Sequence, residues 1–167
     1  MPAVVSDASV LICLGAVRQL HLLHEFYQTI IVPHAVWQEI TTAGASLPGA
    51  KEAVQAKQQG WLTVQSPSNP SLVANLRGSL DAGESEAIAL AAELGVALLL
   101  IDETEGRTAA KGLGLAVTGT LGVLIRAKQF GKFASLKPIL DALIQQHGFR
   151  LSRGLYEQVL REVGETP

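Results

Sequence analysis

The chain has 167 residues, the size of one ordinary domain, and 48% of them are hydrophobic with a mean hydropathy of +0.28, so we expect an ample core. Its longest apolar run, residues 96–101, is far shorter than the roughly 20 residues of a membrane span, and the amino terminus lacks a signal-peptide pattern. The single cysteine, Cys13, excludes an internal disulfide and favours a cytoplasmic location, while the net charge of −2 gives no sign of nucleic-acid binding by itself.

Short apolar runs alternate with helical segments in the first half of the chain. The predicted strands are residues 3–6, 29–32 and 61–64. Helical patterns cover residues 11–16, 20–26, 35–40 and 50–59. Asp7 or Ser9 is placed to cap the first of these helices, Pro33 to open the third and Gly60 to close the fourth.

The second half continues the alternation. An unbroken apolar strand at residues 96–101 is typical of a parallel sheet that is buried on both faces, and a fifth short strand follows at 115–118. The predicted helices cover residues 81–94, 104–113, 120–128, 136–146 and 152–163. Strands that alternate with helices predict an α/β fold with a mostly parallel sheet of about five strands.

Two stretches read as loops. Residues 41–48 form the first, and residues 66–70, with two prolines, are the one plausible linker. Because this second stretch is short and the composition is the same on both sides, we predict one domain over residues 1–167, with a carboxyl-terminal helix at about 152–163.

Carboxylates follow the predicted strands. Asp7 comes directly after the first strand and Asp102 directly after the apolar strand at 96–101. Active sites of open parallel sheets lie beyond the carboxyl ends of the strands, so both acids point to one crevice if these strands are neighbours. Glu105 lies one helical turn past Asp102, Glu84 lies in the first turn of the preceding helix, and Glu39 lies on the helix after the second strand.

Such a set of acids suits a hard divalent cation. Mg²⁺ and Mn²⁺ prefer oxygen ligands, and several converging carboxylates without a base would repel one another unless a cation lay among them. Setting the five acids aside leaves 10 of 15 acidic residues against 13 basic ones, which permits RNA binding elsewhere on the surface. Each acid alone has an alternative reading, because Asp7 and Glu84 could equally cap or stabilise helix starts.

The ordered series resembles the PIN domain family. Asp7-Ala8-Ser9, then Glu39, then Glu84 within GESEAIALA, then Asp102 and Glu105 match its acidic signature. The segments LDAGESEAIALAAELG, LLLIDETEGRTAAKGLGL, VTGTLGVLIRAK and GFRLS resemble small prokaryotic PIN-like proteins, which are often the toxins of toxin–antitoxin modules. The resemblance covers residues 3 to about 163.

The resemblance implies a three-layer α/β/α sandwich and a Mg²⁺- or Mn²⁺-dependent ribonuclease that cleaves single-stranded RNA. Asp7, Glu84 and Asp102 would be the metal ligands, with Glu39 and Glu105 as outer ligands or groups that orient water. Ser9, Thr118 and Thr120 would supply hydroxyls near the phosphate, and a small antitoxin protein would be a partner. Glu84 and Glu105 stand where many members have Asp, which lengthens both side chains by one methylene.

Two rival functions belong to other classes. A PIN scaffold that has lost catalysis could act as a protein or RNA binding module. A phosphatase of small phosphate esters is disfavoured, because Asp7-Ala8-Ser9 lacks the second Asp that would act as an acid.

Other residues have weaker signals. Arg107 and Lys111 could bind RNA phosphates, or Arg107 could orient a site carboxylate. His21 and His24 have helical metal-ligand spacing without a third ligand, and we expect Trp37 and Trp61 in the core rather than as base-stacking surfaces. An apolar stripe on the last helix packs on its own domain or forms a dimer or antitoxin surface: Leu151, Leu155, Tyr156, Val159, Leu160 and Val163.

Overall fold

The computed structural model describes residues 3–43 and 46–167. Five parallel strands form one sheet in the order β3-β2-β1-β4-β5. The strands are β1 (Val4–Ser6), β2 (Ile30–Val32), β3 (Leu62–Val64), β4 (Leu98–Leu100) and β5 (Val117–Thr118). This confirms the predicted parallel sheet of about five strands, although β4 and β5 are shorter than their predicted ranges.

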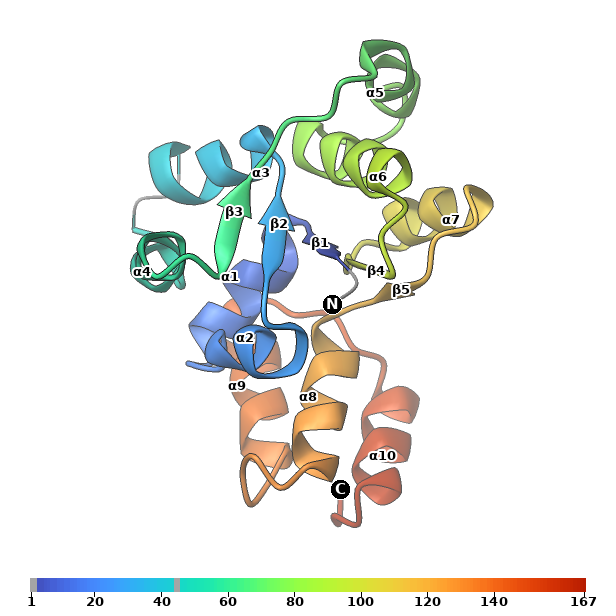
Figure 1. Ribbon diagram of the computed structural model, residues 1–167. Helices are drawn as coiled ribbons and strands as arrows, with labels where there is room; N and C mark the ends of the chain where they lie inside the picture. Colours follow the sequence, from blue (N-terminus) through green and yellow to red (C-terminus); the bar gives the residue numbers. More distant parts are fainter. Residues whose placement is uncertain (1–2, 44–45) are drawn as a thin grey trace. The chain divides into compact units, whose positions relative to one another are not determined.

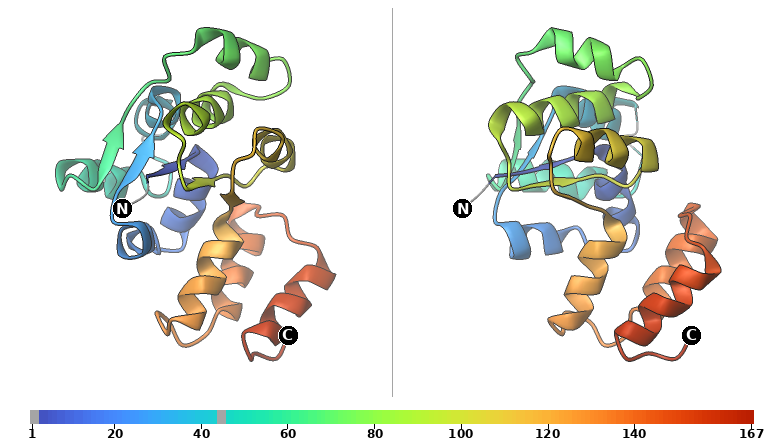
Figure 2. Two further views of the ribbon diagram at one scale, coloured as in Figure 1. Left: turned by 45° about the vertical axis from the view of Figure 1, so that its right-hand side comes forward. Right: turned by 90° about the vertical axis from the view of Figure 1, so that its right-hand side faces the viewer.

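Helices cover the sheet on both faces, which confirms the three-layer α/β/α arrangement (Figure 1). The connections from β1 to β3 contain α1 (Ala8–Ala16), α2 (His21–Tyr27), α3 (His34–Gln38) and α4 (Ala50–Gln58). The connections from β3 to β5 contain α5 (Pro70–Leu76), α6 (Ala82–Leu94) and α7 (Thr104–Gly112). Both views of Figure 2 show α6 on one side of the strands and α2 on the other.

The core lies between the central strands and α6. Val5, Leu99 and Ile101 of the sheet region are fully buried and belong to one cluster with Ile88 and Leu90 of α6. Burial of side chains of this size stabilises the fold by about 1.5–3 kcal/mol each. This packing fixes α6, and with it Glu84, against β1 and β4.

The segment between β2 and β3 and the segment after β3 differ from the sequence-based prediction. The helix after Pro33 continues as a π-helical turn over Glu39–Ala43, into residues 41–43 that were predicted to be a loop. Helix α5 was not predicted; Asn69 caps it by accepting a hydrogen bond from the Leu72 N–H, and Pro70 stands in its first turn. Residues 44–45 of the predicted loop lie outside the described residues.

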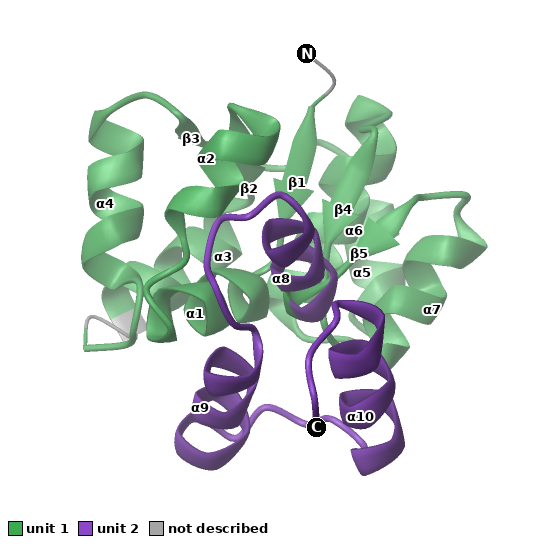
Figure 3. Ribbon diagram, turned by 90° about the horizontal axis from the view of Figure 1, so that it is seen from below, with its two compact units in different colours: residues 1–120 green, residues 121–167 purple. Residues whose placement is uncertain are grey.

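The chain divides into two compact units, residues 1–120 and 121–167 (Figure 3). Helix α8 (Thr120–Gln129) begins at the last residue of the first unit, and the second unit also contains α9 (Lys137–His147) and α10 (Arg153–Glu162). One domain over residues 1–167 stays a prediction. None of the described helices is long and apolar enough to cross a membrane.

The apolar stripe of α10 is buried only at its centre. Val159 and Leu160 are buried, whereas Leu155 is 41% exposed. Helix α10 begins after Ser152, whose hydroxyl accepts a hydrogen bond from the Leu155 N–H. Burial within the chain therefore accounts for the centre of the stripe.

Candidate active site

Asp7 and Asp102 lie where the strand order reverses. Strand β1 lies between β2 and β4, Asp7 follows β1 directly, and Asp102 comes two residues after β4. The Asp7 N–H donates to the Leu100 carbonyl oxygen at 2.9 Å, which extends the pairing of the two strands. Ligands of open α/β sheets bind outside the carboxyl ends of the strands at this kind of position.

Asp7 is the most buried of the candidate acids, with only 2% of its surface exposed. It caps α1: Oδ1 accepts a hydrogen bond from the Val10 N–H at 3.0 Å. Oδ2 is buried without a hydrogen-bond partner among the described residues. Burial raises the pKa of Asp7 well above its usual range, and the charges of Asp102 and Glu84 add to this effect, against hydrogen bonds from the backbone.

Asp102 is fixed by the start of α8. Its Oδ1 accepts from the Thr120 N–H and its Oδ2 accepts from the Thr120 hydroxyl, both at 2.7 Å. Burial raises the pKa of Asp102, although the Thr120 hydrogen bonds and the Arg107 charge oppose the rise. Gly119 makes this arrangement possible, since a Cβ there would lie 2.4 Å from Asp102 Oδ1 and 3.1 Å from Arg107 Nη1.

Glu84 forms a capping box with Asp81 at the start of α6. The Glu84 N–H donates to Asp81 Oδ1 at 2.8 Å, and the Asp81 N–H donates to Glu84 Oε2 at 3.4 Å. Burial raises the pKa of Glu84, and so do the charges of Asp81, Glu103 and Glu105. Glu105 therefore acts on Glu84 through its charge, while its own side chain is exposed.

Glu39 lies in a neighbouring pocket of about 660 Å³, which Arg77 and Asp81 also line. Burial and the charge of Asp81 raise the pKa of Glu39. Its carboxylate also faces Gly83, where a Cβ would lie 3.3 Å from Glu39 Oε2. Glu39 thus belongs to the α3–α6 side of the site, apart from the charges that act on Asp7.

The remaining predicted residues fall into separate places. The Thr120 hydroxyl is engaged by Asp102, and Arg107 Nη1 donates to the Ile101 carbonyl oxygen at 3.1 Å. The effect of Arg107 on the pKa of Asp102 favours the reading in which it orients a site carboxylate. Ser9 is half-buried in α1, and Thr118 ends β5.

Three groups at the site were missed by sequence reasoning. Asp81 acts on both Glu84 and Glu39, and its D-x-x-E spacing to Glu84 is the signal of a capping box. Glu103 also raises the pKa of Glu84 through its charge. Cys13 lies near Asp102 and Asp7; burial raises the pKa of its thiol to about 11, and no sequence motif marks it.

The candidate acids are chemically suited to bind a cation, but their side chains are not close enough together to form a metal site. Asp7, Asp102 and Glu84 carry hard oxygen donors, the charges of Asp102 and Glu84 destabilise the ionised form of Asp7, and Asp7 Oδ2 lacks a partner among the described residues. Within residues 3–43 and 46–167, however, no three His, Cys, Asp or Glu side chains are grouped closely enough to hold a metal ion. The assignment of Asp7, Glu84 and Asp102 as metal ligands stays a prediction.

A family model for the PIN domain matches residues 3–165, which is nearly the whole chain. The chain belongs to the PIN domain family. PIN domains are generally nucleases that use divalent metal ions, so the acids after β1 and β4 stand in a nuclease scaffold.

Among solved structures, this PIN domain is similar to a PilT N-terminus domain protein from the hyperthermophilic archaeon Sulfolobus solfataricus P2. The two share 23% sequence identity and a TM-score of 0.48, over 76% of this chain and 93% of the archaeal one. The comparison with curated proteins found no match.

Proposed function

We propose that this PIN domain is an endoribonuclease that cleaves single-stranded RNA, with a Mg²⁺ or Mn²⁺ ion held by Asp7, Glu84 and Asp102. One observation supports this most strongly: Asp7 Oδ2 is buried without a partner while the charges of Asp102 and Glu84 act on it. A buried carboxylate oxygen without a donor is costly, and a cation would remove both the missing contact and the repulsion.

Each residue has a role that its surroundings support. Asp7 would present its unpartnered Oδ2 from the N-cap position of α1. Asp102 is oriented by two hydrogen bonds from Thr120, as hydrogen-bonded partners commonly orient metal ligands, and the charge of Arg107 acts on it as well. Glu84 would leave its weak 3.4 Å contact with the Asp81 N–H to join them. Glu39 and Glu105 would act from outside, on water or on the other acids.

A bound divalent cation would supply charge stabilisation at the phosphoryl oxygens and lower the pKa of an attacking water. The buried surroundings of Asp7 and Asp102 strengthen their interaction with such a charge, because few water molecules screen it. Arg107, whose charge acts on Asp102, would also contact an RNA phosphate.

The alternative is a catalytically weak PIN scaffold that binds protein or RNA. The contacts of Asp102 favour it, because Thr120 occupies both carboxylate oxygens in this conformation. The longer side chains at Glu84 and Glu105 favour it as well. Normal binding of Mn²⁺ without cleavage of any RNA would support this alternative.

We further propose that the protein acts in the cytoplasm as the toxin of a toxin–antitoxin module. A small antitoxin would insert an Arg side chain among the acids, because a guanidinium fork pairs well with carboxylates. A small protein with such a segment should co-purify at native expression levels. Recovery of the chain by itself at those levels would contradict this partner.

The cleavage test compares Asp7→Asn with a matched control. Asn also caps helices well, so the variant should fold, yet it should cleave single-stranded RNA at least about a hundredfold more slowly with Mn²⁺ present. Glu162→Gln, the same kind of charge loss on the exposed face of α10, should cleave like wild type. Wild-type cleavage that persists in excess chelator would overturn the metal-dependent mechanism.

A further inference from the structure

A second pocket lies at the amino ends of the strands, whereas the carboxylates lie at their carboxyl ends. It has a volume of about 540 Å³, within the range of small-molecule sites. Helix α1 begins at Asp7 on the carboxyl edge and ends near Gly15 and Arg18, which line this pocket with Trp61, just before β3. The candidate active site therefore contributes none of its lining residues.

Arg18 has a conformation that its residue type rarely adopts. It follows the C-cap of α1 with φ +59°, and the Gln19 N–H donates to the Leu14 carbonyl oxygen at 2.8 Å, as in a Schellman motif. Glycine is the usual residue there, because the left-handed region is strained for side chains with a Cβ. A residue that breaks a local rule is a candidate for function.

The charges of this pocket are separated rather than paired. Arg18 and Glu52 both line it, yet within the described part of the chain neither forms an ion pair. Both side chains are exposed, so their charged groups are open to a ligand. A pocket lined by the Arg18 cation and the Glu52 carboxylate suits a ligand with an anionic group at one end and hydrogen-bond donors at the other.

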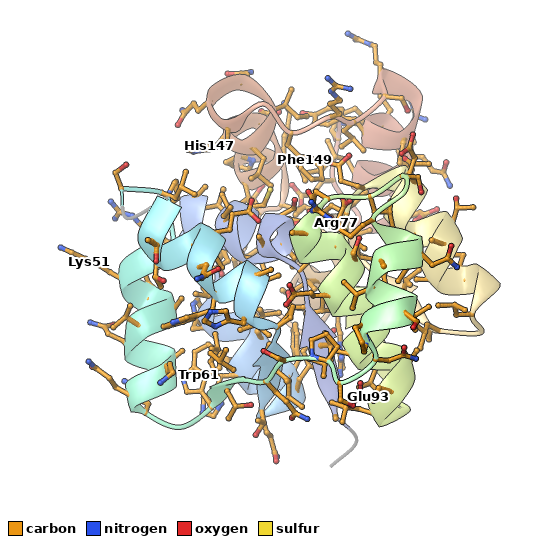
Figure 4. All side chains as sticks on the ribbon, turned by 90° about the horizontal axis from the view of Figure 1, so that it is seen from above. Lys51, Trp61, Arg77, Glu93, His147 and Phe149 are labelled. Carbon is orange, nitrogen blue, oxygen red and sulfur yellow. The ribbon has the colours of Figure 1, made fainter. Side chains whose placement is uncertain are left out.

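Trp61 supplies a fixed aromatic wall. Its ring stacks on His24 with 5.1 Å between the centroids and 19° between the planes, and its Nε1–H donates to Gln59 Oε1 at 3.1 Å. His24 is itself held, since its Nδ1 lies 2.8 Å from the Gln28 carbonyl oxygen. Figure 4 labels Trp61 at one end of α4 and Lys51 at the other.

We propose that this pocket binds a nucleoside monophosphate. Arg18 would pair with the phosphate, the Trp61 ring would contact the base, and Glu52 and Gln55 would accept or donate hydrogen bonds at the base edge. Aromatic contacts of this kind tolerate different bases. The same chemistry is present in a free nucleotide and at the 5′-phosphate end of an RNA strand.

The test measures binding of AMP, GMP, CMP and UMP by titration calorimetry and by Trp fluorescence. Arg18→Gly should raise the melting temperature, because glycine relieves the strained backbone, and should weaken binding at least about tenfold. Lys51→Gln removes a cation from the same helix as Glu52 but outside this pocket, so it should change affinity less than about twofold. Trp61→Phe should keep the fold and abolish the Trp61 contribution to fluorescence quenching.

Two further measurements distinguish a free nucleotide from the 5′ end of an RNA, and this pocket from the candidate active site. A 5′-phosphorylated oligonucleotide that binds more tightly than AMP, and loses this advantage with Arg18→Gly, would assign the pocket to an RNA end; equal or weaker binding would assign it to free nucleotides. Asp7→Asn should bind AMP like wild type, so this inference can hold even if the nuclease proposal fails. No saturable binding of any of the four nucleotides, or binding that Arg18→Gly leaves unchanged, would overturn it.

Discussion

Asp7 has two roles that oppose each other in the absence of a cation. Its Oδ1 satisfies the start of α1, whereas its ionised form is destabilised by burial and by Asp102 and Glu84. Because the folded-state pKa is raised above the unfolded value, the metal-free protein should gain stability as the pH falls. This follows from the sign of the shift: ionisation favours the unfolded state at every pH above the unfolded pKa.

Asp7→Asn should therefore melt higher than wild type in chelator at pH 7.5. The advantage should shrink at pH 5.5, where protonation of Asp7 in wild type already relieves part of the destabilisation. Each kcal/mol corresponds to about 2–4 °C in a chain of this size. Thermal melts of both proteins at the two pH values check this, and a lower melting temperature for the variant at pH 7.5 would mean that the Asp7 charge stabilises the fold.

Gly119 determines whether Asp102 can reach Thr120. Gly119→Ala places a Cβ 2.4 Å from Asp102 Oδ1, so the carboxylate must move and its hydrogen bonds to Thr120 weaken. We expect a loss of about 1–3 kcal/mol in the free energy of unfolding, together with reduced RNA cleavage. Gly112→Ala, where a Cβ meets nothing within 4 Å, is the control and should be neutral or stabilising. Urea denaturation that shows the two variants to be equally stable would contradict this role of Gly119.

At the scale of elements, α9 is capped from a distant part of the chain. Leu136 at its N-cap makes no side-chain cap, and Glu165 instead accepts from the Ser135 hydroxyl at 2.7 Å and from the Leu136 N–H at 2.6 Å. Burial acts to raise the pKa of Glu165, but these hydrogen bonds, one from the Lys137 N–H and the charge of Lys128 lower it to about 2. Glu165 thus replaces a local cap.

Glu165→Gln should destabilise the chain by about 1.5–3 kcal/mol at pH 7, since an amide has one acceptor oxygen and no charge. The lowered pKa gives stability that is present above the ordinary value of 4.5 and lost as the pH falls toward 2. The difference between variant and wild type should therefore narrow from pH 5 to pH 3. Chemical denaturation at both pH values checks this, with Glu162→Gln as the control; a difference independent of pH would rule out a charged cap.

Local signals were sufficient to predict most elements. Asp7 before α1, Pro33 before α3 and Gly95 after α6 stand where strong start and stop residues belong. Helix α5 escaped prediction because none of its residues is buried, so no apolar period marks it. The π-helical turn at Glu39–Ala43 contacts α1 and α4, and no sequence pattern marks it.

At the scale of the whole molecule, the sheet order could not be derived from strand patterns, because pairing joins segments far apart in the chain. The adjacency of Asp7 and Asp102 was predictable only if β1 and β4 were neighbours, and the register Val5↔Leu99 shows that they are. The bonds from Thr120 to Asp102 join residues 18 positions apart, so sequence spacing gave no sign of them. Spacing along the sequence therefore predicted the positions of the acids but not the residues that hydrogen-bond to them.

Calorimetric titration with Mn²⁺ tests the metal site most directly. Wild type should bind the ion saturably, Asp7→Asn at least about tenfold more weakly, and Glu162→Gln like wild type. At 100 times its dissociation constant the ion should also stabilise wild type by about 2.7 kcal/mol, a gain that Asp7→Asn should mostly lose. Mn²⁺ binding of equal affinity in wild type and Asp7→Asn, or none in wild type, would contradict a cation site built on Asp7.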